Sequence, residues 1–379
     1  MTPQQVTDTA PVRPGEDLDW PRVADYLRAK LPGLDGNLEV RQFPNGSANL
    51  TYLLRFGGRP LVLRRPPFGR IAPGAHDMSR EHRVLSRLWR AFAPAPRALL
   101  LCQDESVVGA KFFVMEFRSG VVIWDAIPGS MRHHSDVARR AGFAVVRALA
   151  DLHQVDYARC GLEDLGRPDG FVARQVRGWR SRWDAVARGD AQPVMLEVAD
   201  LLELTRPEPQ CSAILHNDLK LDNCQFDPAD PDRVHSVFDW DMATLGDPLV
   251  DVGTLLNYWP DPADAPGDRG MYPDGLDRMG LPTQAEISAC YAEATGLDLA
   301  GIRWYQAFAC WKTAIVLQQL YDRYRRGETA DERMADRADR VAELAARARR
   351  LLREGGGDVP PLTQPAAQPG GANPRDLGL

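Results

Sequence analysis

Lysine is nearly absent from this chain of 379 residues. It occurs at four positions, Lys30, Lys111, Lys220 and Lys312, so the other 42 of the 46 basic residues are arginine. A genome rich in G and C produces this bias without any functional consequence. The scarcity still limits the chemistry, because a reaction that depends on a lysine has only four candidate side chains.

Three other features are missing, and each excludes a class of protein. The sequence has no apolar run of about 18 residues, so we expect no membrane-spanning helix. Residues 1–16 are polar and lack the apolar core of a secretory signal. The six cysteines form no Cys-x-x-Cys pair, which argues against a zinc site and fits reduced thiols. Together these absences predict a cytoplasmic protein that does not bind membranes.

Charge and length set further bounds. The chain has 46 basic and 52 acidic residues, a net charge of -6, which disfavours nonspecific nucleic-acid binding as the main activity. Residues 1–15 and 355–379 are rich in Pro, Gly and polar groups, and we expect a disordered lead-in and a disordered tail. Between them the length fits two units, which we expect at 16–117 and 118–354.

The N-terminal part has the pattern of a small antiparallel sheet with one main helix. A short amphipathic helix is expected over 20–31, and a longer one from Met78, where apolar residues recur at helical spacing until Pro94. Five segments have strand character and turn signals between them. They are 38–43, 50–56, 60–65, 98–102 and 111–117.

The C-terminal part is predicted to be mostly helical, which makes the whole chain an α+β protein. Ser135 is expected to cap a helix, and another helix is expected over 171–188. Apolar stripes over 304–315 and 341–351 indicate two more, and such stripes usually form core. The segment 213–239 interrupts this pattern with short strands around a polar loop, so we expect the chemistry there.

Three oxygen donors stand out in that segment. Asp218 and Asn223 follow the apolar strand that ends at Leu215, and Asp239 ends the next apolar strand. Carboxylate and amide oxygens suit Mg²⁺, whereas zinc or copper would select softer ligands. Phosphoryl transfer needs this combination: a carboxylate for the nucleophile's proton, metal ions on the phosphates and a nearby cation.

The order of these residues matches a known pattern. His216-Asn217-Asp218-Leu219 followed by Asn223 has the H-x-D-L-x-x-x-N spacing of the protein-kinase catalytic loop. The chain therefore resembles the protein-kinase-like superfamily. It is most similar to the aminoglycoside and choline phosphotransferase family, because the segment 245–248, Leu-Gly-Asp-Pro, follows Asp239 as it does there. The resemblance covers about residues 36–325. It implies a bilobal protein-kinase-like fold and an ATP-dependent, Mg²⁺-requiring transfer to a small-molecule hydroxyl.

The resemblance also implies roles for the loop residues. Asp218 matches the general base, and Asn223 and Asp239 match the metal ligands. Lys220 lies where many kinases place a cation near the γ-phosphate, with a solvent-facing lysine as the alternative. His216 matches a loop histidine that is usually structural, although a direct catalytic role stays open. Two further acids, Asp247 and Asp251, are expected to brace the loop and cap the helix after Pro248, and Asp241 is either a ligand or a structural carboxylate.

The N-terminal lobe is implied to hold the nucleotide. The loop between the first two strands, with Gly46, Ser47 and Asn49, matches the phosphate-covering loop of the family, although an ordinary hairpin turn would look similar. Arg64 aligns with the family's strand-three lysine, and guanidinium can bind phosphate in its place. Three more residues complete the implied site. They are Glu81 as the partner of Arg64, and Glu116 and Phe117, whose backbone would bind the adenine.

The acceptor is less well defined by the sequence. The segment Arg64-Arg65-Pro66-Pro67 resembles the branch often fused or adjacent to acyl-CoA dehydrogenases, which implies a partnership with such an enzyme and a hydroxyacyl-CoA as one candidate acceptor. Arginines over 174–188 would favour an anionic acceptor, whereas acidic residues over 261–277 would favour a polycationic one, and both runs could instead be solvated faces. Two alternatives are a nucleotide-binding pseudokinase, suggested by Arg64, and a Mg²⁺-dependent phosphohydrolase.

Overall fold

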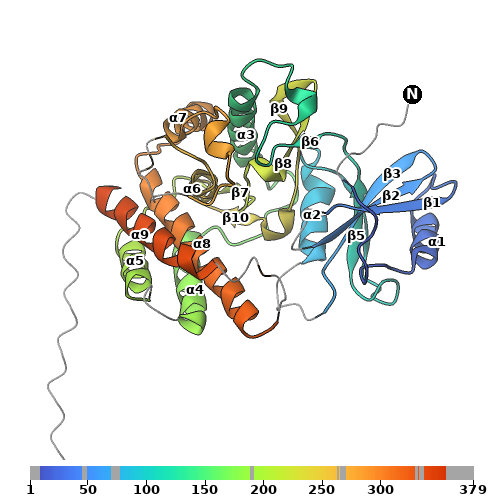
Figure 1. Cartoon of the computed structure of the whole chain (residues 1–379), viewed down its shortest axis with the longest axis horizontal. Coiled ribbons are helices and arrows are strands. Elements are labelled where there is room, and N and C mark those ends of the chain that lie inside the picture. The colour runs from blue at the N-terminus through green and yellow to red at the C-terminus, as the bar shows by residue number, and fades with distance from the viewer. Residues whose placement is uncertain are drawn as a thin grey trace, which may run out of the picture.

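The computed structural model describes residues 9–44, 49–69, 77–187, 192–262, 264, 270–328, 332 and 337–355. The chain forms two lobes that lie side by side, a sheet-containing lobe from the N-terminal part and a larger lobe that is mostly helical (Figure 1). This confirms the predicted α+β, protein-kinase-like architecture. The predicted C-terminal tail lies outside the described residues apart from its first position.

The N-terminal lobe is built on a five-stranded antiparallel sheet in the order β1-β2-β3-β5-β4. All five strands occur where the sequence predicted them. Their bounds are β1 Leu38–Gln42, β2 Leu50–Phe56, β3 Arg59–Arg65, β4 Ala98–Cys102 and β5 Phe112–Glu116. The neighbouring segment 9–15 was expected to be disordered, but Ala10 pairs with Gln42 of β1 through two backbone hydrogen bonds of 2.8 Å.

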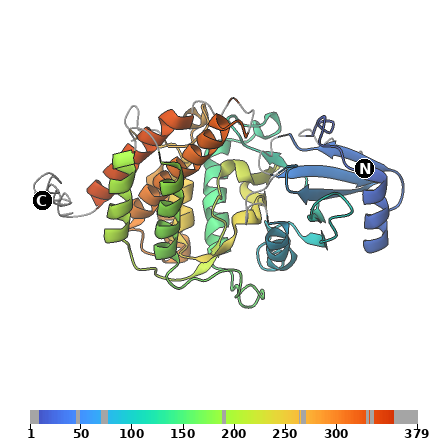
Figure 2. The same cartoon turned by 90° about the horizontal axis from the view of Figure 1, so that it is seen from below.

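Two helices cover the opposite faces of this sheet. Helix α1 (Trp20–Lys30) packs on one face, where alternate strand residues such as Leu54 and Leu63 form a small core with Leu27. Helix α2 (Met78–Leu88) lies on the other face, on the side of the helical lobe (Figure 2). It begins at Asp77, whose Oδ1 accepts hydrogen bonds from the backbone N–H groups of the first turn at 3.0 and 3.2 Å.

The C-terminal lobe contains the remaining helices of the described chain. They are α3 Val137–His153, α4 Phe171–Val186, α5 Gln192–Leu204, α6 Leu249–Asn257, α7 Gln284–Thr295, α8 Ile302–Arg325 and α9 Arg337–Gly355. Two small sheets lie among them. One pairs β7 Ala213–Leu215 with β10 Thr244–Gly246, and the other contains β6 Val121–Val122, β8 Cys224–Asp227 and β9 Asp230–Val237. Across the described ranges, none of the helices has the length and apolarity needed to cross a membrane.

The predicted cap of α3 differs from the structure. Ser135 was expected to cap α3, but the helix begins two residues later, at Val137. Asp136 precedes it in a left-handed conformation (φ 50°), and no side chain caps the helix. The apolar periodicity therefore predicted the helix correctly, whereas its start is set by a turn that the cap preference alone does not reveal.

The main core continues from one lobe into the other. The inward face of α2, including Val84 and Leu88, belongs to the same apolar cluster as Leu149 of α3 and Ile214 of β7. The second cluster is confined to α1 and the outer face of the sheet. The boundary at residue 117 stays a prediction, and the shared core shows that α2 is held by both lobes.

Candidate active site

The catalytic-loop candidate begins at the end of β7. His216 is fully buried, and its ring Nε2 contacts the carbonyl of Phe238 at 2.7 Å. Its Nδ1 accepts a hydrogen bond of 3.3 Å from the backbone N–H of Asp218. Burial lowers the pKa of His216, which favours the neutral ring. Both ring nitrogens therefore hold backbone groups, an arrangement that fits a structural histidine and leaves neither nitrogen for a substrate.

A buried carboxylate braces the same loop from below. Asp251, on α6, accepts hydrogen bonds of 2.7 Å from the backbone N–H groups of His216 and Asn217, one on each oxygen. His153 lies 3.3 Å from the same carboxylate and 2.6 Å from the hydroxyl of Tyr291. Asp247 accepts from the N–H of Leu249 at the start of α6, at 3.0 Å. Both acids thus do what the sequence predicted.

We expect Asp251→Asn to destabilise the protein by about 3 kcal/mol, because an amide cannot accept both backbone N–H groups and a buried network is broken. Burial alone would raise the pKa of Asp251, but the hydrogen bonds from His153 and from the loop lower it below its usual value. A lowered native pKa stabilises the fold above the unfolded value of about 3.9, and this contribution is lost as the pH falls. Urea unfolding between pH 7 and pH 3 checks both points. The difference between wild type and variant should shrink with acidification, and a constant difference would contradict the assignment.

The loop brings three of the predicted residues into contact. Lys220 Nζ lies 2.6 Å from Asp218 Oδ2, and Asn223 Nδ2 donates to that same oxygen at 3.0 Å. Asn223 Nδ2 also donates to the Asp218 carbonyl at 2.7 Å, which leaves its Oδ1 as a free ligand atom in this geometry. In the described chain, Asp218 Oδ1 has no such contact, so it can receive a proton from an acceptor hydroxyl.

Lys220 lies in a setting that keeps it charged. Burial would lower the pKa of Lys220, but the carboxylates of Asp218 and Asp222 raise it above its usual value. The ammonium group also lies 5.4 Å from the ring centroid of Tyr258. The lysine is only 18% exposed, so it is not the solvent-facing residue of the alternative interpretation.

The N-terminal lobe reaches this site through one arginine. Arg64, on β3, lies with Nη1 3.0 Å from Glu81 Oε1, and its Nη2 donates to Asp239 Oδ1 at 2.7 Å. Arg64 and Glu81 are both buried, and Asp239 is partly exposed. The predicted Arg64–Glu81 pair therefore exists, and it extends to the carboxylate that follows the second apolar strand.

Acidic side chains with raised pKa values lie in and around the Arg64–Glu81 pair. Burial raises the pKa of Glu81 to about 8, and Arg64 opposes this rise only in part. Burial and the neighbouring Asp239 raise the pKa of Asp241 to about 6. Asn49 lies against Asp241, and its buried amide makes no hydrogen bond of regular geometry. Asp239 itself and Asn217 have left-handed backbone angles (φ 68° and 66°), a strain that proteins keep mainly at functional sites.

These residues suit a magnesium ion that arrives with phosphates. In the part of the chain that the structure describes, no group of three or more His, Cys, Asp or Glu side chains could hold a metal ion. Mg²⁺ is commonly bound by one or two protein ligands together with substrate phosphates and water. Asn223 Oδ1 and the Asp239 carboxylate are donors of that kind. The buried and unpaired atoms of Asn49 and Arg64 Nε indicate room for further polar partners.

The predicted adenine-binding segment needs one correction. The N–H of Glu116 donates to the Arg97 carbonyl at 3.0 Å, so it is not available to a nucleotide. The N–H of Arg97 in turn donates to Glu116 Oε1 at 3.1 Å, so it does not bind the Glu116 carbonyl. That carbonyl and the backbone of Phe117 stay the predicted adenine contacts. Gly46 and Ser47 lie outside the described residues.

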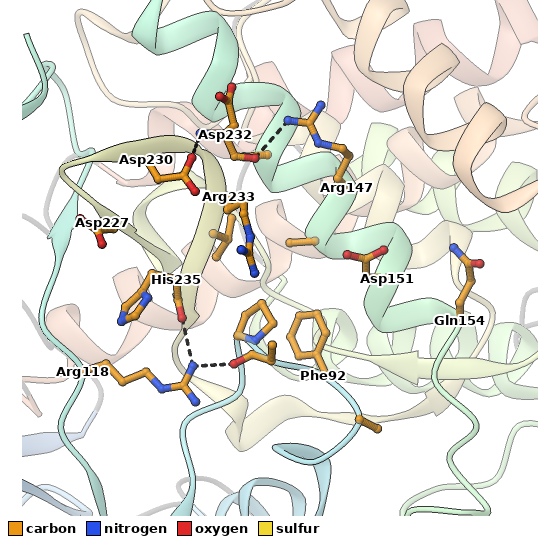
Figure 3. A pocket seen from close by; sticks show the side chains of 16 residues that line it. Phe92, Arg118, Arg147, Asp151, Gln154, Asp227, Asp230, Asp232, Arg233 and His235 are labelled. Carbon is orange, nitrogen blue, oxygen red and sulfur yellow. Dashed lines mark hydrogen bonds between the residues drawn. The ribbon is translucent and has the colours of Figure 1, made fainter. Parts of the chain in front are cut away.

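A separate hollow of about 860 Å³ lies between α3, the β9 strand and the segment before β4. Figure 3 shows Arg147 and Asp151 of α3 on one side and Asp232 and His235 on the other. None of the predicted site residues lines it. Arg118 crosses its edge and donates to the carbonyls of Ala93 and His235 at 2.6 and 3.0 Å, which ties the segment after β5 to both lobes.

Sequence reasoning missed two residues near Asp218. Tyr258, at the end of α6, contributes the ring beside Lys220, and Lys312 of α8 lies 3.4 Å from the carbonyl of Asn217. No local motif marks either residue. The scarcity of lysine was the available signal for Lys312, since two of the four lysines in the chain lie at this site.

Comparison with known proteins agrees with this geometry. The model of the Phosphotransferase enzyme family matches residues 39–280. The chain is 33% identical over 346 residues to chicken (Gallus gallus) acyl-CoA dehydrogenase family member 11, covering 89% of this chain and 44% of that protein. It thus spans less than half the length of this curated relative.

Solved structures support the same relationship. A protein from Ralstonia eutropha, named as a possible aminoglycoside phosphotransferase, has a TM-score of 0.74 and 31% identity, covering 89% of this chain and 99% of that one. A thermostable mutant of aminoglycoside phosphotransferase APH(4)-Ia, solved with AMP-PNP and hygromycin B, has the same fold, with a TM-score of 0.55, 17% identity, and 89% and 99% coverage. Because the family model covers more than half of the chain, and the loop from His216 to Asn223 has the expected geometry, this protein belongs to the phosphotransferase enzyme family.

Proposed function

We propose that this protein transfers the γ-phosphoryl group of ATP to a hydroxyl of a small molecule. The observation that carries the proposal is the bridge made by Arg64, which joins Glu81 of the N-terminal lobe to Asp239 beside the catalytic loop. A kinase needs such a link, because the phosphates must be held between a cation on the sheet and metal ligands below it. The relative solved with AMP-PNP supports a nucleotide as the donor.

In this proposal the residues of the N-terminal lobe bind the nucleotide. Arg64 contacts the phosphates, with Glu81 holding its guanidinium group in place. Asn49 and the loop before it cover the phosphates, and the Glu116 carbonyl and the Phe117 backbone accept the adenine. Asn223 and Asp239 would hold Mg²⁺, which neutralises charge on the phosphate oxygens.

The transfer step uses Asp218 and Lys220. The acceptor hydroxyl gives its proton to Asp218 Oδ1, and its oxygen forms a bond to the γ-phosphorus. The bond between this phosphorus and the β–γ bridging oxygen breaks, and ADP leaves with the electron pair. Lys220 stabilises negative charge on the transferring group. His216 acts as a positioning residue, since both of its ring nitrogens bind backbone groups.

We further propose a hydroxyacyl-CoA as the favoured acceptor class and an acyl-CoA dehydrogenase as a functional neighbour. The name of the chicken relative supports this pairing, because that longer protein is named as an acyl-CoA dehydrogenase family member. None of the six cysteines, all of which lie among the described residues, forms a disulfide, and this fits a reducing compartment such as the cytoplasm.

Asn223→Ala should raise the Mg²⁺ concentration needed for half-maximal activity by about tenfold or more, because it removes one oxygen ligand. Asn223→Asp supplies an oxygen at the same position and should keep a lower Mg²⁺ requirement than the alanine variant. Initial rates measured over a Mg²⁺ titration at saturating ATP test this. Identical Mg²⁺ curves for the wild type and the alanine variant would remove Asn223 from the metal site.

The test of the proposed function is a phosphorylation screen with ATP and Mg²⁺ against hydroxylated metabolites, including hydroxyacyl-CoA thioesters and aminoglycosides. The product is recognised by the mass of one added phosphoryl group. We expect a phosphorylated hydroxyl compound that the Asp218→Asn variant does not form. If the protein binds ATP but phosphorylates nothing in a broad screen, the pseudokinase alternative is favoured and the proposal fails.

A further inference from the structure

Lys312 lies at the catalytic loop, although no part of the transfer described above uses it. The residue is on α8, and its Nζ donates to the carbonyl of Asn217, the residue before Asp218, over a long distance of 3.4 Å. The ammonium group also lies 5.7 Å from the ring centroid of Trp179 on α4. A lysine is thus held where two helices of the C-terminal lobe meet the loop that carries the general-base candidate.

The charge of Lys312 is poorly compensated. Within the described ranges, no carboxylate lies within 4.0 Å of its ammonium group, and the Asn217 carbonyl is its one hydrogen-bond acceptor. An ammonium group has three N–H donors, so two are left over. Burial lowers the pKa of Lys312. The carboxylates of Asp218 and Asp251 oppose this shift from a distance, and the nearby Arg182 adds to it. An ammonium group in this setting, with no carboxylate in direct contact, can be stabilised by an anion that a ligand supplies.

A second cation stands beside the first. Arg182 of α4 lies over the ring of Trp179, with Cζ 4.5 Å from its centroid. Two other arginines on this helix are occupied: Arg180 pairs with Asp200 at 2.5 Å, and Arg174 donates to backbone carbonyls. In the described chain, Arg182 makes no ion pair with a carboxylate. Of the arginines predicted to favour an anionic acceptor, Arg182 is thus the one that stands next to Lys312.

Two of the acidic residues expected at the mouth of the site have partners elsewhere in the lobe. The carboxylate of Asp261 accepts a hydrogen bond of 2.8 Å from the N–H of Gln284, and Asp264 pairs with Arg347 at 2.9 Å. Asp268 lies outside the described residues. These two acids therefore serve the internal structure of the lobe and are not presented to a polycationic acceptor.

Lys312 also lies on the side from which an acceptor must approach. From the sheet, Arg64 contacts Asp239 and Asn49 lies against Asp241. From the helical lobe, α8 reaches the loop through Lys312 at the Asn217 carbonyl, and α4 packs against α8. Since the phosphates would occupy the first side, an acceptor hydroxyl reaches Asp218 from the second. A fixed cation there can bind the acceptor and orient it.

We propose that Lys312, with Arg182 beside it, binds an anionic group of the acceptor, a carboxylate or a phosphate, and thereby places the acceptor hydroxyl at Asp218. This inference rests on the proposed function, because it assigns the substrate class of the same site. It makes Lys312 a residue that determines specificity for negatively charged acceptors, in a family fold that also serves the aminoglycoside phosphotransferase solved with hygromycin B.

The test measures binding and does not need turnover. Calorimetry of the protein–ADP complex compares three probes: 3-hydroxybutyrate with its carboxylate, its neutral methyl ester, and 3-hydroxybutyryl-CoA with its phosphates. We expect wild type to bind at least one anionic probe more than tenfold more tightly than the ester, and the probe that binds best identifies the anionic group. Lys312→Gln should weaken that binding by about tenfold to a hundredfold, the range for one hydrogen bond to a charged group, and leave the ester nearly unchanged.

Three variants serve as controls. Lys312→Arg should keep the preference for anions. Arg182→Gln, at an exposed position, should reduce this preference by a smaller factor than Lys312→Gln does. The Arg182 variant also keeps the test available if Lys312→Gln folds poorly. Lys111→Gln, at an exposed lysine in the other lobe, should change nothing. If Lys312 serves ligand binding and not stability, the melting temperature of Lys312→Gln should equal or exceed that of the wild type.

Equal binding of the three probes by wild type, or no binding of any, overturns the proposal, and so does an equal loss for ester and anions in Lys312→Gln. A preference for anions without any phosphoryl transfer would instead contradict the proposed function and leave the anion site intact.

Discussion

Asp218→Asn is expected to lower kcat by about 10²–10⁴-fold, the usual contribution of a general base, with the KM for ATP nearly unchanged. The asparagine keeps the size of the side chain but cannot take the acceptor's proton. It can still contact Lys220 and Asn223, whose nitrogens now lie 2.6 and 3.0 Å from Asp218 Oδ2. Because nucleotide binding depends on other residues, the loss should fall on the chemical step.

The matched control for this variant is Asp222→Asn. Asp222 lies 3.9 Å from Lys220 on the same loop. It therefore interacts electrostatically with the same cation but takes no part in the proposed proton transfer. Steady-state kinetics should show a far smaller loss for this variant. If both substitutions lower kcat equally, the loss comes from the charge balance around Lys220, and Asp218 is not the base.

Arg64→Ala should raise the KM for ATP more than tenfold and destabilise the protein by about 3–5 kcal/mol, the cost of leaving buried charges without their partner. Both effects have one cause. Arg64 is the cation that contacts Glu81 at 3.0 Å and Asp239 at 2.7 Å. Its removal leaves these two carboxylates without their shared positive partner, and it also removes the positive charge that would contact the phosphates. ATP titrations and urea unfolding measure the two effects separately.

Arg64→Lys distinguishes the two roles of this side chain. A lysine supplies the charge and should restore much of the activity, because the family places lysine at this position. Its single ammonium group cannot contact the carboxylates of Glu81 and Asp239 together as the planar guanidinium group of Arg64 does, so stability should recover only in part. Arg325→Ala, at an exposed position near the end of α8, is the control for general loss of an arginine. Unchanged ATP kinetics in Arg64→Ala would show that Arg64 does not bind the nucleotide.

Local sequence patterns were sufficient for much of the fold. Alternation and turn residues located the strands of the N-terminal sheet, and helical spacing located α2 and α8, since each of these signals depends on a few neighbouring residues. Helices α5 and α7 were not identified. Their positions depend on packing against α9 and α3, which lie far from them along the chain.

The site was predictable where a motif is continuous along the chain. The spacing from His216 to Asn223 was enough to single out the catalytic-loop candidate, and Asp251 braces it as expected. The contact between Arg64 and Asp239 joins residues 175 positions apart, and Lys312 is 95 positions from Asn217. No periodicity encodes such contacts, because they arise when the lobes and helices pack. The Glu116 correction has a similar origin, since its N–H is taken by the carbonyl of Arg97, the residue before β4.

The most direct test of the account is a product balance in one incubation with ATP, Mg²⁺ and the acceptor identified by the screen. ADP, phosphorylated acceptor and free phosphate are quantified together, with and without the acceptor. A kinase predicts one phosphorylated acceptor for each ADP and no ADP above background when the acceptor is left out. ADP and free phosphate formed equally without an acceptor would instead identify a phosphohydrolase and contradict the central claim.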